Sequence, residues 1–71
     1  MTKIMVVDDD EEFTTLYQKY LTMAGFEAVT ENHSSMAMEV ANSAQPDLFV
    51  LDLMMPEPDG FKLCRMLRAN M

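Results

Sequence analysis

The sequence predicts an α/β fold in which three parallel strands, in the order 2-1-3, alternate with three helices. Short apolar runs alternate three times with segments of helical periodicity, a pattern typical of βαβ units with right-handed crossovers. The second run is the most polar and suits an edge strand, whereas the first is apolar throughout and suits the sheet interior. Ligands of such sheets bind where the strand order reverses, which here lies between strands 1 and 3.

The first strand and helix give the clearest signal. Residues 3–7 (KIMVV) form an apolar, partly β-branched run, and residues 10–24 carry apolar side chains at helical spacing. Acidic residues crowd the first turn, where they suit the helix dipole, and Gly25 is the expected C-terminal cap. The apolar stripe consists of Phe13, Leu16, Tyr17, Tyr20, Leu21 and Ala24.

The second unit is more polar. Residues 26–31 (FEAVTE) mix β-branched with polar side chains, as expected of a partly buried strand. Residues 35–44 are expected to form a helix capped by Ser34 or Ser35 and terminated before Pro46. Its narrow apolar stripe consists of Ala37, Val40, Ala41 and Ala44.

The third unit begins with residues 47–52 (DLFVLD), a strand that is apolar on both faces. A proline-rich turn leads to a helix expected over residues 59–69, with Asp59 as its N-cap. We expect Cys64 to be a small core residue of this helix. The predicted inward stripe consists of Gly60, Leu63, Cys64 and Leu67.

Composition limits the functional classes. Seventy-one residues allow a single domain, and twelve acidic against five basic residues give a net charge of −7. This charge argues against nucleic acid as a direct partner. The sequence shows neither a secretory signal nor an apolar stretch long enough to cross a bilayer, and a lone cysteine suits a reducing compartment. We therefore expect a soluble, cytoplasmic protein without a membrane partner, whose nine methionines mainly fill the core.

Acidic residues follow two of the predicted strands. Asp8, Asp9 and Asp10 come directly after the first strand, and Asp52 ends the third. Two carboxylates about 4 Å apart repel by about 4 kcal/mol at an effective dielectric constant of 20, so such a cluster must bind a proton or a cation. Mg²⁺ suits it, and a carboxylate beside Mg²⁺ can accept a phosphoryl group. Taken separately, the first run also suits a solvated helix start, and Asp52 a turn.

Together, VVDDDEE and LFVLDLMMPEPDGF resemble the receiver domain of bacterial two-component response regulators, a flavodoxin-like (CheY-like) fold. The resemblance implies that Asp52 is the phosphoacceptor. It also implies a Mg²⁺ cofactor bound directly by Asp9 and by Asp52, with Asp8 acting through water. The backbone carbonyl of Met54 would be a further ligand.

The same resemblance assigns structural roles nearby. Met55 and Pro56 would shape the loop after the phosphoacceptor, and Gly60 would permit the turn into the next helix. Asp10 matches no metal ligand and is expected to be a helix cap. His33, between the second strand and the second helix, is expected to be a surface residue rather than a phosphodonor.

A complete receiver has five βα units, and residues 1–71 match the first three. The resemblance therefore implies a truncated, half-sized receiver domain. The family's Ser or Thr after strand 4 and its Lys after strand 5 have no counterpart, and Lys3, Lys19 and Lys62 are not placed to replace that lysine. We expect phosphorylation to be impaired as a result.

The third predicted strand would also have a bare edge. Because a flat, apolar edge recruits another strand, we expect a homo-oligomer formed through this strand, or complementation by a missing half from another chain.

Three functions compete on this sequence. The first is a phosphoacceptor module, not an enzyme, that receives phosphate from a histidine-kinase phosphodonor. The second is a truncated or engineered half-receiver that acts as a structural, self-assembling unit without phosphotransfer. The third is a metal-dependent phosphatase-like enzyme, which is disfavoured because Met54 stands where that class has an acid/base aspartate.

Overall fold

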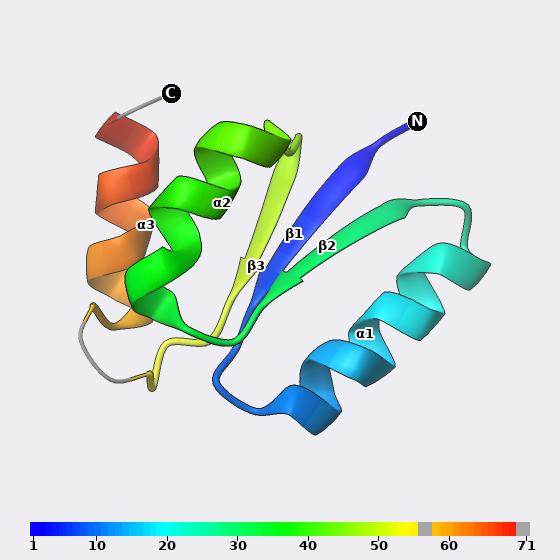
Figure 1. Cartoon of the computed structure of the whole chain (residues 1–71), viewed down its shortest axis with the longest axis horizontal. Coiled ribbons are helices and arrows are strands. Elements are labelled where there is room, and N and C mark those ends of the chain that lie inside the picture. Colours follow the sequence, from blue (N-terminus) through cyan, green and yellow to red (C-terminus); the bar gives the residue numbers. More distant parts are fainter. Residues whose placement is uncertain (56–57, 70–71) are drawn as a thin grey trace.

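The computed structural model describes residues 1–55 and 58–69. Its centre is a three-stranded parallel sheet in the order β2-β1-β3, the order predicted from the sequence. The strands are β1 (Lys3–Val7), β2 (Glu27–Glu31) and β3 (Leu48–Leu51). They lie side by side in Figure 1, with β1 between the other two.

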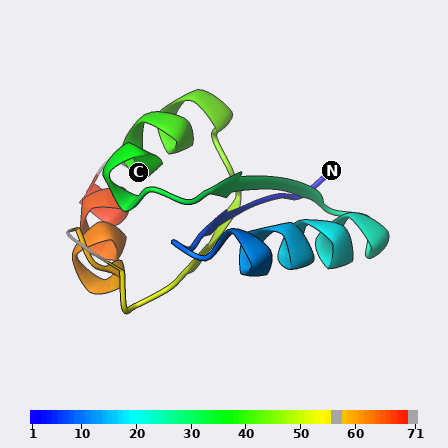
Figure 2. The ribbon, with the colours of Figure 1, turned by 60° about the horizontal axis from the view of Figure 1, so that its bottom comes forward.

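The helices cover the two faces of the sheet unequally. Helix α1 (Glu11–Met23) lies on one face, against β1 and β2, whereas α2 (Ala37–Ala44) and α3 (Gly60–Ala69) lie on the other (Figure 2). The observed bounds of strands and helices differ from the expected ones by at most two residues. Part of the difference arises because Asp10 and Asp59 cap their helices instead of belonging to them.

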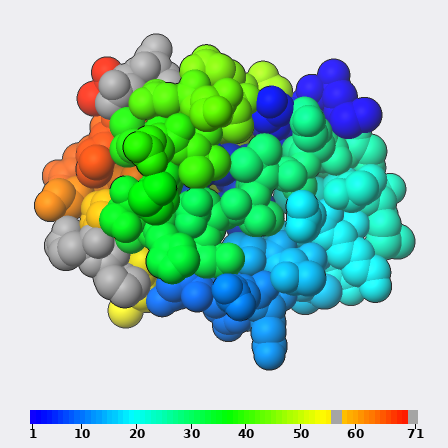
Figure 3. Space-filling model, viewed as in Figure 1, coloured from blue at the N-terminus to red at the C-terminus, as the bar shows by residue number. Residues whose placement is uncertain are grey.

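The main core lies between the sheet and the pair α2 and α3. Met5 and Val7 of β1 contribute to it, whereas the alternating residues Ile4 and Val6 point to the α1 face. All four of these residues are buried, so the prediction that the first strand lies inside is confirmed. Figure 3 shows α2 and the segment before it lying over part of the sheet on this side. The core cluster comprises Met5, Val7, Ala37, Ala41, Met55, Leu63 and Leu67.

Both ends of α1 follow from local sequence. The Asp10 side chain accepts hydrogen bonds from the backbone N–H groups of the first helical turn, as expected of an N-cap. At the other end Gly25 has φ +93°, and the N–H groups of Gly25 and Phe26 donate to the carbonyl oxygens of Thr22 and Leu21. This Schellman arrangement satisfies carbonyl groups that the helix leaves unpaired.

The second helix begins differently from the prediction. A short 3₁₀ turn, Ser34–Met36, precedes α2, and neither this turn nor the helix has a side-chain N-cap bond. The expectation that Ser34 or Ser35 caps the helix is therefore wrong. The 3₁₀ turn supplies its own backbone bond, from the Met36 N–H to the His33 carbonyl. Gln45, with φ 52°, ends the helix before Pro46.

Two burial predictions are also wrong. Cys64 is exposed, because its side of α3 faces a hollow beside β3 instead of the core. Among the methionines in the described part of the chain, only Met5 and Met55 are buried, because most of the others lie on outer helix faces and in loops.

Apolar surface is exposed around β3 and α1. Within the described residues, β3 pairs with β1 on one side and with no strand on the other, and Leu48 is 53% exposed. The apolar stripe of α1 is also largely exposed, and Thr14 is the one residue of the helix that is buried. No helix in the described ranges has the length and hydropathy needed to span a membrane.

Candidate metal centre

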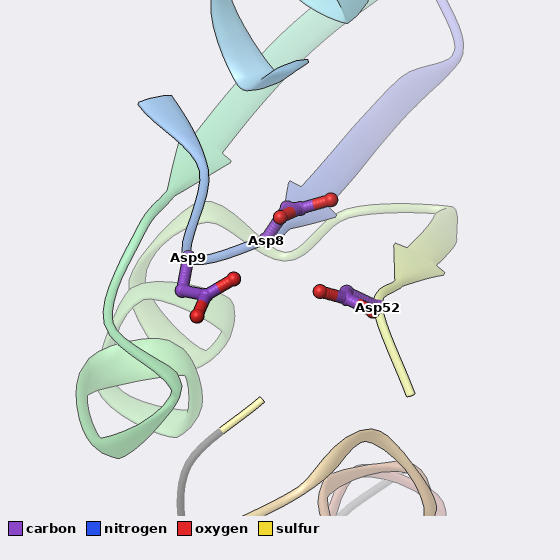
Figure 4. Close-up of side chains that lie close together, drawn as sticks. All are labelled: Asp8, Asp9 and Asp52. Atoms are coloured by element: carbon purple, nitrogen blue, oxygen red, sulfur yellow. The ribbon is translucent and has the colours of Figure 1, made fainter. Parts of the chain in front are cut away.

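Three carboxylates meet at the carboxyl edge of the sheet. Asp8 and Asp9 follow β1, Asp52 follows β3, and one oxygen of each lies within 4.8 Å of the others. Figure 4 shows the Asp52 side chain reaching toward the other two across a gap. The strands bring them together because β1 and β3 pair in parallel, with Val7 opposite Leu51. The cluster expected at the switch in strand order is therefore present.

Backbone hydrogen bonds extend the sheet as far as the aspartates. The Asp8 N–H donates to the Glu31 carbonyl at 3.1 Å, and the Asp52 N–H donates to the Val7 carbonyl at 3.0 Å. Each aspartate thus lies one residue beyond its own strand. Its backbone N–H is still hydrogen-bonded to the last residue of the adjacent strand, β2 for Asp8 and β1 for Asp52. This attachment restricts how far the two carboxylates can separate.

Turn hydrogen bonds orient two of the carboxylates. The Asp10 N–H donates to Asp8 Oδ1 at 2.9 Å, and the Met54 N–H donates to Asp52 Oδ1 at 3.0 Å. Both are local bonds from an aspartate to the N–H two residues later, a common turn device. Both bonds go to Oδ1, which leaves Oδ2 of each carboxylate as the oxygen free of these turn bonds for a cation or a reacting group.

Electrostatic repulsion is built into this cluster. Partial burial raises the pKa of the Asp8 carboxyl group above its ordinary value, and repulsion from Asp52, Asp9 and Asp10 acts in the same direction. The hydrogen bond from the Asp10 N–H lowers the same pKa but does not outweigh them. The ionised cluster is therefore under strain that a divalent cation would relieve.

A hollow on the α1 side of the sheet adjoins the carboxylates. Its walls combine acidic side chains with the apolar residues Val6, Phe13, Tyr17 and Val50. No lysine is among its lining residues in the part of the chain that the structure describes.

The other residues singled out in the sequence lie around the cluster. Met54 belongs to the turn after Asp52, Met55 is buried, and Pro56 lies outside the described residues. Gly60 is buried against the same turn, where an added Cβ would lie 2.6 Å from the Leu53 Cα. The structure thus supplies a steric reason for glycine at position 60, since a side chain there would meet the backbone of this turn.

Two remaining assignments are confirmed. Asp10 is the N-cap of α1 and not a member of the carboxylate cluster. The His33 side chain is 76% exposed, and its Nδ1 lies 3.3 Å from Glu31 Oε2. A surface role for His33 is what the sequence predicted.

One contact of the Asp8 loop was not predicted from the sequence. The Asn32 side chain, just after β2, donates hydrogen bonds to the Asp8 carbonyl and to Thr14 Oγ1, both at 2.9 Å. The position of Asn32 just after a strand could have indicated that it lies near Asp8, because the carboxyl ends of parallel strands share one edge of the sheet. Nothing in the sequence around Thr14 predicts that this residue is buried while the apolar stripe of α1 is largely exposed.

Comparison with known proteins agrees with this geometry. Residues 4–71 match the model of the response regulator receiver domain family. The chain is 42% identical over 68 residues to the alkaline phosphatase synthesis transcriptional regulatory protein PhoP of Bacillus subtilis (strain 168). This match covers 96% of the chain and 28% of that regulator.

Solved structures show the same arrangement of strands and helices. The BeF₃-activated N-terminal receiver domain of Klebsiella pneumoniae RstA is 41% identical, with a TM-score of 0.92 over 99% of this chain and 60% of that one. Thermotoga maritima TrrA, solved in complex with Mg²⁺-BeF, is 30% identical, with a TM-score of 0.91 over 99% of this chain and 61% of that one.

The chain thus spans less than a third of the curated PhoP relative and about three fifths of these two solved chains. Its three parallel strands in the order 2-1-3, with three helices, form the corresponding part of a flavodoxin-like, CheY-like fold. The protein belongs to the response-regulator receiver domain family of two-component signalling systems.

Proposed function

We propose that this chain is a phosphoacceptor module, in which Asp52 takes a phosphoryl group from the phosphohistidine of a histidine-kinase donor. The observation that carries the proposal is the cluster of Asp8, Asp9 and Asp52, whose oxygens lie within 4.8 Å of one another. The family supports it further, because the cluster occupies the motif positions on which the receiver resemblance rests.

The donor set fits Mg²⁺. Asp9 and Asp52 offer hard oxygen ligands for direct binding, and we assign the backbone carbonyl of Met54 as the third direct protein donor, with Asp8 acting through water. When bound, the ion would neutralise charge on the cluster and on the transferred group. The raised pKa of Asp8 supports this assignment, since it arises from partial burial and, beside it, from the mutual repulsion of the carboxylates, which a cation would relieve. The relative TrrA was solved with Mg²⁺-BeF, which adds to the support.

The chain's own residues would orient the reaction. The Met54 N–H holds Asp52 Oδ1, so Oδ2 is the nucleophile. As Oδ2 forms a bond to phosphorus, the bond between phosphorus and the donor's imidazole nitrogen breaks, and the electron pair stays on that nitrogen. Because no lysine lines the described hollow, the carboxylate lacks a cationic partner after transfer. We therefore expect phosphorylation of this chain to be slow.

Acetyl phosphate tests the proposal without a kinase. Incubation with acetyl phosphate and Mg²⁺ should add one phosphoryl group, measured by intact mass, and EDTA should prevent it. The Asp52→Asn variant should show no adduct. The control Asp47→Asn makes the same change at the opposite end of the sheet, where Asp47 accepts a bond from the Lys3 N–H, and should retain the adduct.

Other results would contradict the proposal. An adduct that survives in Asp52→Asn would exclude Asp52 as the acceptor. Phosphate release in molar excess over protein would favour a phosphatase-like enzyme instead of a phosphoacceptor. Absence of any adduct after prolonged incubation would favour a structural unit without phosphotransfer.

We also propose that the outer edge of β3 is covered by another strand in the functional protein. Its support is the unpaired edge among the described residues and the exposure of Leu48. A second copy could supply the strand, as could a complementing half on another chain. A cytoplasmic location stays a prediction from the sequence.

A further inference from the structure

We propose that Asn32 is a positioning residue for the metal centre, because its amide fixes the Asp8 turn from the segment just after β2. The proposal rests on the proposed function only in taking the three carboxylates as a cation site. The Asn32 side chain bonds the Asp8 backbone carbonyl and Thr14 Oγ1, so its effect on the carboxylates is indirect.

The amide of Asn32 uses both of its donor hydrogens. Nδ2 lies 2.9 Å from the Asp8 carbonyl oxygen and 2.9 Å from Thr14 Oγ1. A carbonyl oxygen can only accept, so the amino group of the side chain must face Asp8. The side chain is half-buried, where these bonds are less open to competition from water than at the surface.

Thr14 gives the second bond a fixed direction. The Thr14 hydroxyl donates to the Glu11 carbonyl at 3.1 Å, which leaves its lone pairs to accept from Asn32. Thr14 is 3% exposed, so removal of the hydroxyl would leave a donor of Asn32 without its protein partner. The bonds therefore run in one sense, from Asn32 through Thr14 into the first turn of α1.

Three elements are joined at Asp8 in this way. The Asp8 N–H is bonded to the end of β2, its carbonyl to Asn32, and its carboxylate to the Asp10 N–H. The turn is thus held at its backbone before any ion arrives. Because the carboxylates repel one another, a loosened turn would widen the gap toward Asp52, and binding would then have to pull it back. Preorganisation of this kind raises affinity by reducing the cost of ordering.

The test is direct cation binding, with Mn²⁺ as the probe and free Mn²⁺ counted by electron paramagnetic resonance. Asn32→Ala should weaken binding about tenfold, the lower end of the range for outer partners of metal ligands. Asn42→Ala is the matched control, because Asn42 is an exposed residue of α2. The Mn²⁺ affinity of this variant should stay within about twofold of that of the parent. Neither change alters the net charge, so the carboxylate field is the same in all three proteins.

A second pair of variants separates positioning from folding. Thr14→Val removes the hydroxyl and should weaken Mn²⁺ binding several-fold, whereas Thr14→Ser keeps an oxygen for Asn32 and should bind like the parent. Circular dichroism defines a temperature at which each variant is folded, and affinity is measured there. If Asn32→Ala does not fold, the Thr14 pair decides: equal affinities for Val and Ser would overturn the inference.

The outcomes also separate this inference from the proposed function. Parent-like affinity in a folded Asn32→Ala overturns the positioning role and leaves the metal centre intact. If the Asp9→Asn variant binds Mn²⁺ as tightly as the parent, the metal centre itself is overturned, and the positioning role of Asn32 with it. Weaker binding in Asn32→Ala and Thr14→Val alone, with both controls unchanged, supports the proposal.

Discussion

Asp8 is the residue at which the needs of folding and of function conflict most directly. Its carboxylate is half-buried and faces the charges of Asp52 and Asp9, so the folded state disfavours its ionised form. The same crowding is what gives the site its attraction for a cation. In a metal-free protein at neutral pH, Asp8 should therefore cost stability.

This conflict predicts the effect of Asp8→Asn on unfolding. A raised folded-state pKa means that the contribution of Asp8 is fully present below its ordinary value of 3.8 and is lost as pH rises through the raised pKa. In EDTA at pH 7, Asp8→Asn should thus unfold at a higher temperature than the parent, and the difference should vanish as pH falls toward 3.8. Excess Mg²⁺ should stabilise the parent more than the variant. Thermal unfolding followed by circular dichroism measures each case.

Glu39→Gln serves as the control, because Glu39 is an exposed carboxylate in the first turn of α2. This substitution also removes one negative charge, but at a site that is not part of the cluster. If Asp8→Asn were less stable than the parent at pH 7 in EDTA, the account of Asp8 as a strained carboxylate would be wrong.

The carboxylate cluster was predictable from sequence, whereas its supports were not. Asp8, Asp9 and Asp52 follow apolar strands, and the geometry of parallel sheets alone places strand ends together. Asn32 and Thr14 act through a backbone carbonyl and a buried hydroxyl. Contacts of this kind depend on where three elements meet in space, and no local pattern of residue types encodes them.

At the scale of elements, local signals predicted most ends and missed those set by packing. Asp10 and Gly25 cap α1 as expected, because their bonds lie within a few residues of each other. The start of α2 was missed, since the 3₁₀ turn before it satisfies its own backbone. Cys64 was placed inward by spacing, but the space it faces is the hollow beside β3.

The two glycines should respond to substitution by alanine for different reasons, steric crowding at Gly60 and backbone strain at Gly25. An Ala at Gly60 would place its Cβ 2.6 Å from the Leu53 Cα and 2.8 Å from the Asp52 carbonyl carbon. Both are backbone atoms of the turn after β3, so the turn must move. We expect Gly60→Ala to cost about 3 kcal/mol, the upper end of typical overpacking, and also to weaken Mn²⁺ binding.

Gly25→Ala is the matched comparison. Gly25 has open space around it but φ +93°, so the substitution meets backbone strain alone and should cost about 1–2 kcal/mol. It lies at the far end of α1 and should leave Mn²⁺ affinity unchanged. Urea unfolding measures the two free energies, and a larger loss at Gly25 than at Gly60 would contradict the steric role of Gly60.

At the scale of the whole molecule, the sheet is well covered on one side and poorly on the other. The face toward α2 and α3 holds the core cluster. On the α1 face, Phe13 and Tyr17 are 53% and 41% exposed and border the hollow that adjoins the carboxylates. The sequence predicted the apolar stripe of α1, but periodicity shows which residues share a face and not whether a neighbour covers it.

The exposed edge of β3 leads to the last prediction, that this chain associates with itself through that edge. Two copies related by a two-fold axis normal to the sheet would pair their β3 strands antiparallel, and the carboxylate clusters would then lie at opposite ends of the joint sheet. With a net charge of −7 on each chain, this separation reduces repulsion between the copies. Sedimentation velocity over micromolar concentrations should therefore show a monomer–dimer equilibrium.

One substitution at the edge tests where the copies meet. Leu48→Lys places a charge on the 53% exposed first residue of β3, and charged edge residues oppose strand pairing, so the equilibrium should shift to monomer. Met23→Lys makes the same change in charge at the 73% exposed last residue of α1, on the other side of the sheet, and should leave the equilibrium unchanged. Equal effects of the two would point to net charge as the cause. A parent chain that sediments as a folded monomer throughout would show instead that the bare edge of β3 does not recruit a second copy.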